Sequence, residues 1–175
     1  MKRVSVIMGL LLVAVSAFCQ NAWEFETELI DGNVIITGYT GSEKYIHIPE
    51  KIYKMTVVAI GDHAFAEKQL TGVTIPYGVT SIGDGAFYGN RIKGVAIPSS
   101  VTSIGAAAFS NNEIKNVVIP GSVTFIGESA FANNCIKNIF TPNSIASVGG
   151  YDFSENKDSE NKFSENKFSY ELIFF

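Results

Sequence analysis

The chain repeats itself every 22 residues, and this period constrains the fold more than any other feature. Four consecutive copies begin at Ile60, Ile82, Ile104 and Ile126 and follow one another without a gap. A fifth window from Val148 keeps the glycine and the phenylalanine of the pattern and then departs from it. One unit cannot bury its own apolar face, but stacked units can, with equivalent residues meeting at the strand spacing of about 4.8 Å. The period therefore predicts a solenoid.

Each copy carries the same order of small, aromatic and branched residues. A glycine follows the first isoleucine and is expected at a bend where a Cβ does not fit. The phenylalanine of the next Ala-Phe pair is expected to form a ladder inside the core, from Phe65, Phe87, Phe109 and Phe131. A stretch such as Val95-Ala96-Ile97-Pro98 then alternates, which indicates a half-buried strand that proline ends. A second short extended run returns the chain to the next Ile-Gly corner.

Two polar columns also recur. An asparagine column is expected to bond the backbone of its own and the neighbouring coils, and it comprises Asn90, Asn112 and Asn134. Acidic residues follow the glycine in three copies, at Asp62, Asp84 and Glu128, and are expected to cap a single helical turn. A row of calcium ligands is the alternative, but Ala106 interrupts it.

Residues 1–19 have the pattern of a signal peptide. Lys2 and Arg3 precede a weakly polar to apolar run that ends at Phe18. The run is shorter than the roughly 18 apolar residues of a spanning helix, and an uncleaved anchor is the alternative. Cleavage is expected after Ala17 or after Cys19, and acylation of Cys19 is a further alternative. The sequence thus predicts an exported chain that is secreted, periplasmic or on the outer cell surface.

The rest of the chain divides into three parts. Residues 20–59 are expected to form a β-hairpin cap, with a turn at Asp31-Gly32, and a degenerate first coil in which Ile46-His47-Ile48-Pro49 echoes the repeat. An insertion of five residues is expected within 50–57. Residues 60–147 are the four repeats, and residues 148–175 are a degenerate last coil, a low-complexity SENK tract and an aromatic tail.

Composition argues against several kinds of function. The net charge of −4 gives no attraction to nucleic acid. Two histidines and two cysteines leave little material for a metal site or a Cys/His pair, and Cys135 has no intramolecular disulfide partner once Cys19 is removed or acylated. No nucleophile, base and orienting group recur together. We therefore expect neither an enzyme nor a cofactor, and membrane contact only through a lipid anchor.

The unit IGxxAFxxNxIKxVxIPxSVTS resembles the BspA-like leucine-rich repeat, also called the Treponema pallidum type. The resemblance is close from Ile60 to Ser147 and extends over Tyr39 to Ala59 as a degenerate coil. It implies a β-rich, right-handed superhelix with a parallel sheet on the concave face and short turns and strands on the convex side. It also implies a bacterial cell-surface or secreted protein, since several members are adhesins that bind host extracellular proteins. The few repeats and the decayed last coil depart from the family pattern.

The residues between the inward-facing valines and isoleucines are the candidate partner-binding surface. If the apolar residues point inward, three columns point out, and they comprise Thr74, Ala96, Val118 and Phe140, then Gly72, Gly94, Asn116 and Asn138, and then Thr71, Lys93, Lys115 and Lys137. Exposed apolar patches tend to mark partner sites, whereas strand propensity and solvation of lysines are the alternative explanation. The sequence favours an adhesin that attaches to host extracellular proteins or cells. A self-associating structural or envelope protein without a host ligand is the alternative.

Overall fold

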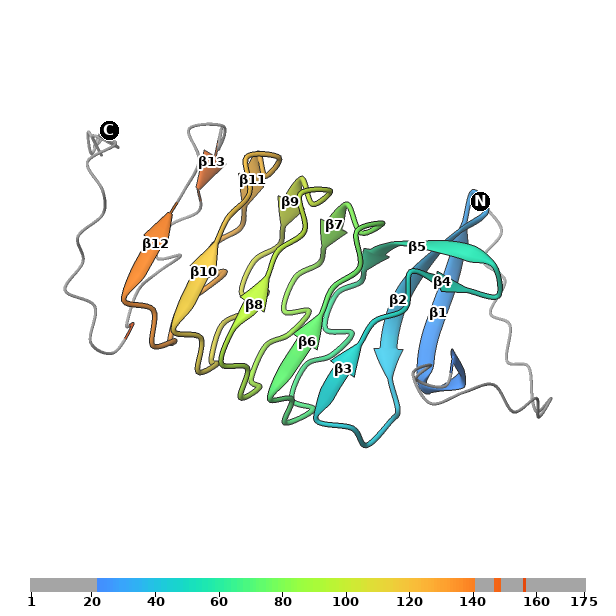
Figure 1. Ribbon diagram of the computed structural model, residues 1–175, viewed down its shortest axis with the longest axis horizontal. Coiled ribbons are helices and arrows are strands. Elements are labelled where there is room, and N and C mark those ends of the chain that lie inside the picture. The colour runs from blue at the N-terminus through green and yellow to red at the C-terminus, as the bar shows by residue number, and fades with distance from the viewer. Residues whose placement is uncertain (1–21, 141–146, 149–155, 157–175) are drawn as a thin grey trace, which may run out of the picture.

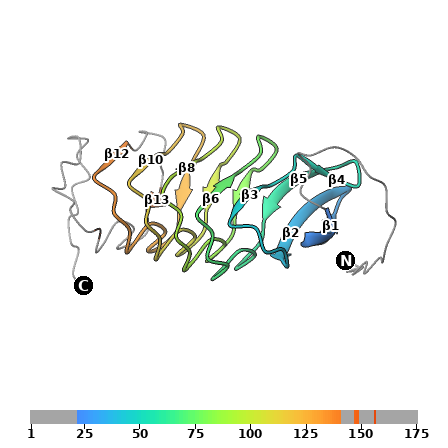
Figure 2. The ribbon, with the colours of Figure 1, turned by 60° about the horizontal axis from the view of Figure 1, so that its bottom comes forward.

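The computed structural model describes residues 22–140, 147–148 and 156, and for 138–140 and 147–148 it describes the backbone alone. The described chain winds into a row of similar coils that leads away from a β-hairpin (Figures 1 and 2). Helix is confined, within these residues, to one 3₁₀ turn, η1 (Ala22–Glu24). The expected β-rich solenoid is therefore confirmed.

A hairpin stands at the N-terminal end of the row (Figure 1). Strands β1 (Phe25–Ile30) and β2 (Asn33–Tyr39) pair antiparallel. Their turn residues Asp31 and Gly32 have φ angles of 50° and 77°, as a tight turn matching the strand twist requires. Beside it, β4 (Lys51–Ile52) and β5 (Met55–Ile60) form a second small hairpin within the region where the insertion is expected.

Two sets of parallel strands run the length of the coils. One set comes from the V-x-I stretches and comprises β3 (Tyr45–His47), β6 (Gly72–Thr74), β8 (Val95–Ala96), β10 (Asn116–Val118) and β12 (Asn138–Phe140). β3 pairs with β6, β10 pairs with both β8 and β12, and β6 lies beside β8.

The other set continues the hairpin sheet. It comprises β2, β5, β7 (Ser81–Ile82), β9 (Ser103–Ile104), β11 (Phe125–Ile126) and β13 (Ser147–Val148). Along β7 to β13, each strand pairs with the equivalent residues of the next copy, so Ile82 lies opposite Ile104. The 22-residue period is therefore the register of the sheet.

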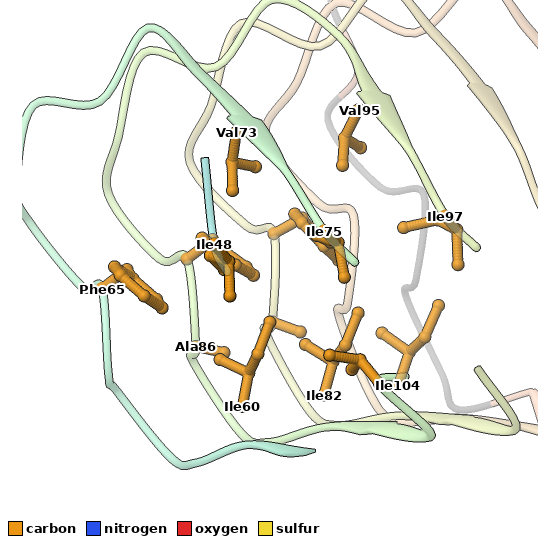
Figure 3. Close-up of a cluster of buried hydrophobic side chains, with 14 of the residues drawn as sticks. Ile48, Ile60, Phe65, Val73, Ile75, Ile82, Ala86, Val95, Ile97 and Ile104 are labelled. Carbon is orange, nitrogen blue, oxygen red and sulfur yellow. The ribbon is translucent and has the colours of Figure 1, made fainter. Parts of the chain in front are cut away.

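The core lies between these two sets of strands. Figure 3 shows Val73, Ile75, Val95 and Ile97 on one side of it, with Ile60, Ile82 and Ile104 on the other. All of these side chains are buried. Stacking of the coils buries the branched side chains of both sets of strands, and this burial is the main source of stability. A single coil could not bury them.

The predicted phenylalanine ladder is confirmed. Phe65, Phe87, Phe109 and Phe131 are fully buried, and successive ring centroids lie 5.2, 5.1 and 5.2 Å apart with interplanar angles of 5°, 11° and 7°. Tyr39 of the hairpin continues the ladder at 5.7 Å from Phe65. The cap is thus joined to the repeats through the core.

The glycine after each isoleucine is required by close stacking of the coils. A Cβ added to Gly83 would lie 2.7 Å from the backbone nitrogen of Asp62, and one added to Gly105 would lie 2.6 Å from that of Asp84. Real Cβ atoms do not approach backbone atoms so closely. The expectation that a Cβ does not fit is confirmed, and its cause is the preceding coil.

The asparagine column forms a second ladder, as predicted. Asn112 accepts a hydrogen bond at Oδ1 from the Ile92 N–H at 3.0 Å, and its Nδ2 donates to the carbonyls of Phe87 and Phe109 at 2.9 and 3.1 Å. Asn90 and Asn134 repeat this pattern one coil before and one coil after. Each amide thus satisfies backbone groups of two coils at once.

Asn156 of the SENK tract also belongs to the asparagine ladder, although the repeat pattern was expected to be lost there. Asn156 accepts from the Ile136 N–H at 2.9 Å and donates to the Phe131 carbonyl at 3.2 Å. Asn156 follows Asn134 by one repeat length. The repeat pattern therefore extends at least to Asn156, three residues beyond Phe153.

The acidic residues after the glycine bind differently from the prediction. Oδ1 of Asp62 accepts from the Asp84 N–H at 2.8 Å, and Oδ1 of Asp84 accepts from the Ala106 N–H at 2.7 Å. The segments that follow are turns, with His63 at φ 54° and Ala107 at φ 52°, and no helical turn forms there. The expectation of helix capping is wrong, because the carboxylate reaches the equivalent N–H of the next coil instead.

Replacing Tyr39 with phenylalanine is expected to preserve the fold and to reduce the loss of stability at alkaline pH. The Tyr39 hydroxyl is buried and meets no partner of good geometry. Its pKa is raised chiefly by burial, then by the charge of Glu24, and the nearby Glu43 backbone offsets part of the rise. Above about pH 10 the unfolded chain loses this proton first, so stability falls by up to about 1.4 kcal/mol per pH unit.

Urea unfolding of the parent and Tyr39→Phe chains from pH 7 to pH 11 measures this effect. At pH 7 the variant is expected to equal the parent or to gain about 1 kcal/mol, since an unpartnered hydroxyl leaves the core. Tyr53→Phe is the control, because that side chain is exposed. A parallel decline of the parent and Tyr39→Phe chains above pH 10 would contradict the prediction.

Candidate functional site

The outward side of the V-x-I strands, called the strand face below, carries the candidate residues. We define it as the exposed side chains of β3, β6, β8 and β10 together with Lys93, Lys115 and Lys137. Thr74, Ala96 and Val118 are exposed as expected, and Val118 has 64% of its surface in solvent. The Phe140 backbone pairs with Val118, and its side chain lies outside the described part. The central column therefore presents a branched apolar side chain to solvent at Val118.

The second expected column is uneven. Asn116 is exposed, and its backbone pairs with that of Asn138, whose side chain lies outside the described part. Gly94 is open, with no atom within 4 Å of a Cβ built there. Gly72 is buried, because a Cβ there would lie 2.6 Å from the Tyr45 ring. Along this column, Gly72 is covered by the Tyr45 ring, Gly94 is open to solvent, and Asn116 presents an exposed amide.

The lysine edge is present as expected. Lys93, Lys115 and Lys137 are exposed, and the N–H of each later lysine donates to the carbonyl of the one before it, at 3.2 and 3.3 Å. Thr71 is exposed in the equivalent place on the previous coil. Across residues 22–140, no ion pair joins these ammonium groups to a carboxylate. Within the described part of the chain, the edge is therefore a set of cations without an acidic partner.

The first coil adds two aromatic residues that the sequence reasoning did not assign to this surface. In the β3–β6 pairing, Tyr45 lies opposite Gly72 and His47 lies opposite Thr74. The two rings are 5.0 Å apart, and the Tyr45 hydroxyl lies 3.5 Å from Thr74 Oγ1. The Ile-His-Ile-Pro motif at 46–49 could have indicated the outward position of His47, because it places His47 between two inward-facing isoleucines.

The outward side of the other sheet is used by the scaffold itself. Thr80, Thr102 and Thr124 are exposed, and each hydroxyl donates to a carbonyl of the previous coil, at 3.1 to 3.2 Å. Phe125 also lies on this side, with 46% of its surface exposed. By contrast, Asn116 and the three lysines make no side-chain hydrogen bond with the described residues. Among the described residues, Asn116 and the three lysines therefore keep their polar groups available to a partner.

Other candidates have little geometric support. His63 is exposed in a turn, and Cys135 is a half-buried free thiol. No group of three or more His, Cys, Asp or Glu within the described part could hold a metal ion. No described helix is long and apolar enough to cross a membrane. The signal peptide and Cys19 lie outside the described residues.

Comparisons with known proteins define the class. The family model of the BspA type leucine rich repeat region matches residues 39–169 with six copies. The chain therefore belongs to the BspA-type leucine-rich repeat family. No curated protein matches it.

Solved structures give the same fold. A leucine-rich repeat protein of T. pallidum is similar with a TM-score of 0.74 and 25% identity, over 80% of this chain and 68% of that one. One from Bacteroides ovatus has a TM-score of 0.68 and 28% identity, over 79% of this chain and 38% of that one. A leucine-rich cell surface protein from Faecalibacterium prausnitzii has a TM-score of 0.53 and 28% identity, over 81% and 53%. The chain thus spans only part of the length of these bacterial proteins.

Proposed function

We propose that the chain is an exported binding module that attaches to proteins of a host matrix or cell surface through its strand face. The observation that carries the proposal is Val118, a branched apolar side chain held mostly in solvent beside unpaired lysines. Apolar residues exposed in this way within a polar rim are typical of partner sites.

The scaffold behind the face supports this role. The strands that carry Ala96 and Val118 are parallel neighbours in register. The phenylalanine and asparagine ladders fix the coils behind them. A surface that is ordered before binding loses less entropy when a partner docks. A rigid array of short strands therefore suits protein recognition.

Export rests on the N-terminal sequence pattern and on relatives. Residues 1–19 have the charge and apolar run of a signal peptide. The similar protein of F. prausnitzii is described as a cell surface protein. Both support a location where a host protein is within reach.

Binding of the purified chain to a panel of immobilised extracellular matrix proteins tests the proposal. We expect saturable binding to at least one of them, with the chain a monomer in solution. No binding, together with a solution mass that rises with concentration, would instead favour a self-associating structural protein.

Val118→Glu is expected to weaken this binding by at least tenfold. The substitution places a charge where a partner removes water, and an unpaired charge is costly there. Phe125→Glu is the control, because it makes the same kind of change on the other side of the same coil. Surface plasmon resonance on both variants, after circular dichroism confirms folding, measures the effect. Equal affinity of the two variants would contradict the use of the strand face.

A further inference from the structure

The three lysines at the edge of the strand face form an evenly spaced row of charge. The backbones of Lys93, Lys115 and Lys137 are neighbours, so the side chains start about 4.8 Å apart. Each is exposed, and among residues 22–140 none is paired with a carboxylate. Glu113 is the nearby acid in sequence, and Arg91 holds the equivalent place one coil earlier. Like charges at this spacing repel, and an anionic partner would relieve that repulsion.

We propose that this row receives an acidic amphipathic helix of the partner protein, lying along the solenoid axis. The inference rests on the proposed protein-binding function and names the partner's chemistry. Carboxylates on one face of a helix recur about every 5.4 Å, one per turn. Three lysines span two strand spacings, and two turns of a helix are longer than these two spacings by about 1.2 Å. The four-carbon lysine stem absorbs such a difference.

An extended partner segment fits the row less well. Side chains on one face of a strand are about 6.7 Å apart, so the mismatch over the same two intervals is about 3.8 Å. The spacing therefore favours a helix over a strand as the occupant of this edge.

The width of the face fits the same occupant. Asn116 and Val118 are exposed on the same side of β10, about 6.7 Å apart, and Lys115 directly precedes that strand. A helix with its side chains is about 10 to 12 Å wide, so one that covers Asn116 and Val118 also comes within reach of the long, flexible Lys115 side chain. The partner helix therefore needs carboxylates at i, i+4 and i+7 and an adjoining apolar stripe over Ala96 and Val118. Charge pairs at the exposed edge set the register, and burial of Val118 supplies most of the affinity.

The test uses the full chain and a fluorescent, end-capped helical peptide with that pattern of glutamate and leucine. A second peptide has the same composition but two central prolines, which prevent helix formation. Fluorescence anisotropy at low salt measures both. We expect saturable binding of the helical peptide and at least fivefold weaker binding of the proline peptide.

The chain variants separate the lysine row from general charge. Lys93→Gln/Lys115→Gln is expected to weaken binding of the helical peptide about fivefold. Lys51→Gln/Lys54→Gln removes the same charge from two exposed lysines of the small β4–β5 hairpin and is expected to leave binding unchanged. Because all four side chains are exposed, folding should be preserved, and thermal unfolding checks this.

The outcomes distinguish this inference from the proposed function. Equal loss in the two double variants, or equal binding of the two peptides, would overturn the helix assignment. Binding of a matrix protein that needs Val118 but not the lysines, without binding of either peptide, would overturn it while leaving the proposed function intact. Lysine-dependent binding of heparin, with no peptide bound, would overturn it in favour of a sulfated polysaccharide. Lysine-dependent peptide binding supports the inference even if every matrix protein in the panel fails to bind.

Discussion

Replacing Asn112 with alanine is expected to lower the free energy of unfolding by about 3 kcal/mol. The change leaves the N–H of buried Ile92 without its partner. The carbonyls of Phe87 and Phe109 lose one of their donors and keep the other, from Asn90 and Asn134 respectively. Each buried group that loses its only partner costs about 1 to 3 kcal/mol, and the deleted amide also leaves a small cavity. Urea unfolding followed by circular dichroism measures the loss.

Asn111 provides the matched control for this prediction. It is the adjacent asparagine, at a left-handed φ of 56°, and its side chain makes one weak bond, 3.4 Å long, to Ser110 Oγ. Gly89 occupies the same place one coil earlier at φ 67°, so Asn111→Gly is expected to change stability by less than about 1 kcal/mol. If the two variants unfold with the same free energy, the asparagine ladder is not a source of stability.

Replacing Phe109 with alanine is expected to cost about 3 to 5 kcal/mol, the range for a buried phenylalanine. Its ring is fully buried and stacks on Phe87 and Phe131, so the substitution removes two ring contacts and opens a cavity in the middle of the ladder. Because each coil contacts only its neighbours, the break also separates the two halves of the solenoid. We therefore expect both a lower stability and a broader unfolding transition.

Calorimetry and urea unfolding measure both expected effects of Phe109→Ala. Phe125→Ala is the control, since that ring is 46% exposed and its removal should cost about 1 kcal/mol. Equal losses at the two positions would show that the ring ladder does not hold the coils together.

The repeat made most of the scaffold predictable. Equivalent residues meet when units of equal length stack, so the Phe109 and Asn112 columns had to become ladders. The hydrogen-bond partner of Asp62 was harder to predict, because a carboxylate after glycine can cap its own turn or reach the next coil. Only the coil spacing shows that it binds the Asp84 N–H. Asn156 was hidden because the five-residue SENK period obscures the 22-residue register.

The candidate site was less predictable than the scaffold. The alternation of Val117, Val118 and Ile119 placed Val118 outward, as the structure shows. The position of Tyr45 over Gly72 depends on pairing between the irregular first coil and the first full repeat. The insertion between them disrupts the period, so register alone could not align the two coils.

Hydroxyl-radical footprinting of the chain, free and bound to a matrix protein, tests most directly whether the strand face is the binding surface. Tyr45 and Val118 are exposed on that face, at 53% and 64%, whereas Trp23 and Phe125 are exposed elsewhere, at 70% and 46%. The account predicts that the bound partner lowers oxidation of Tyr45 and Val118 and leaves Trp23 and Phe125 unchanged. Protection of Phe125 or Trp23, with Val118 still oxidised as in the free chain, would contradict it.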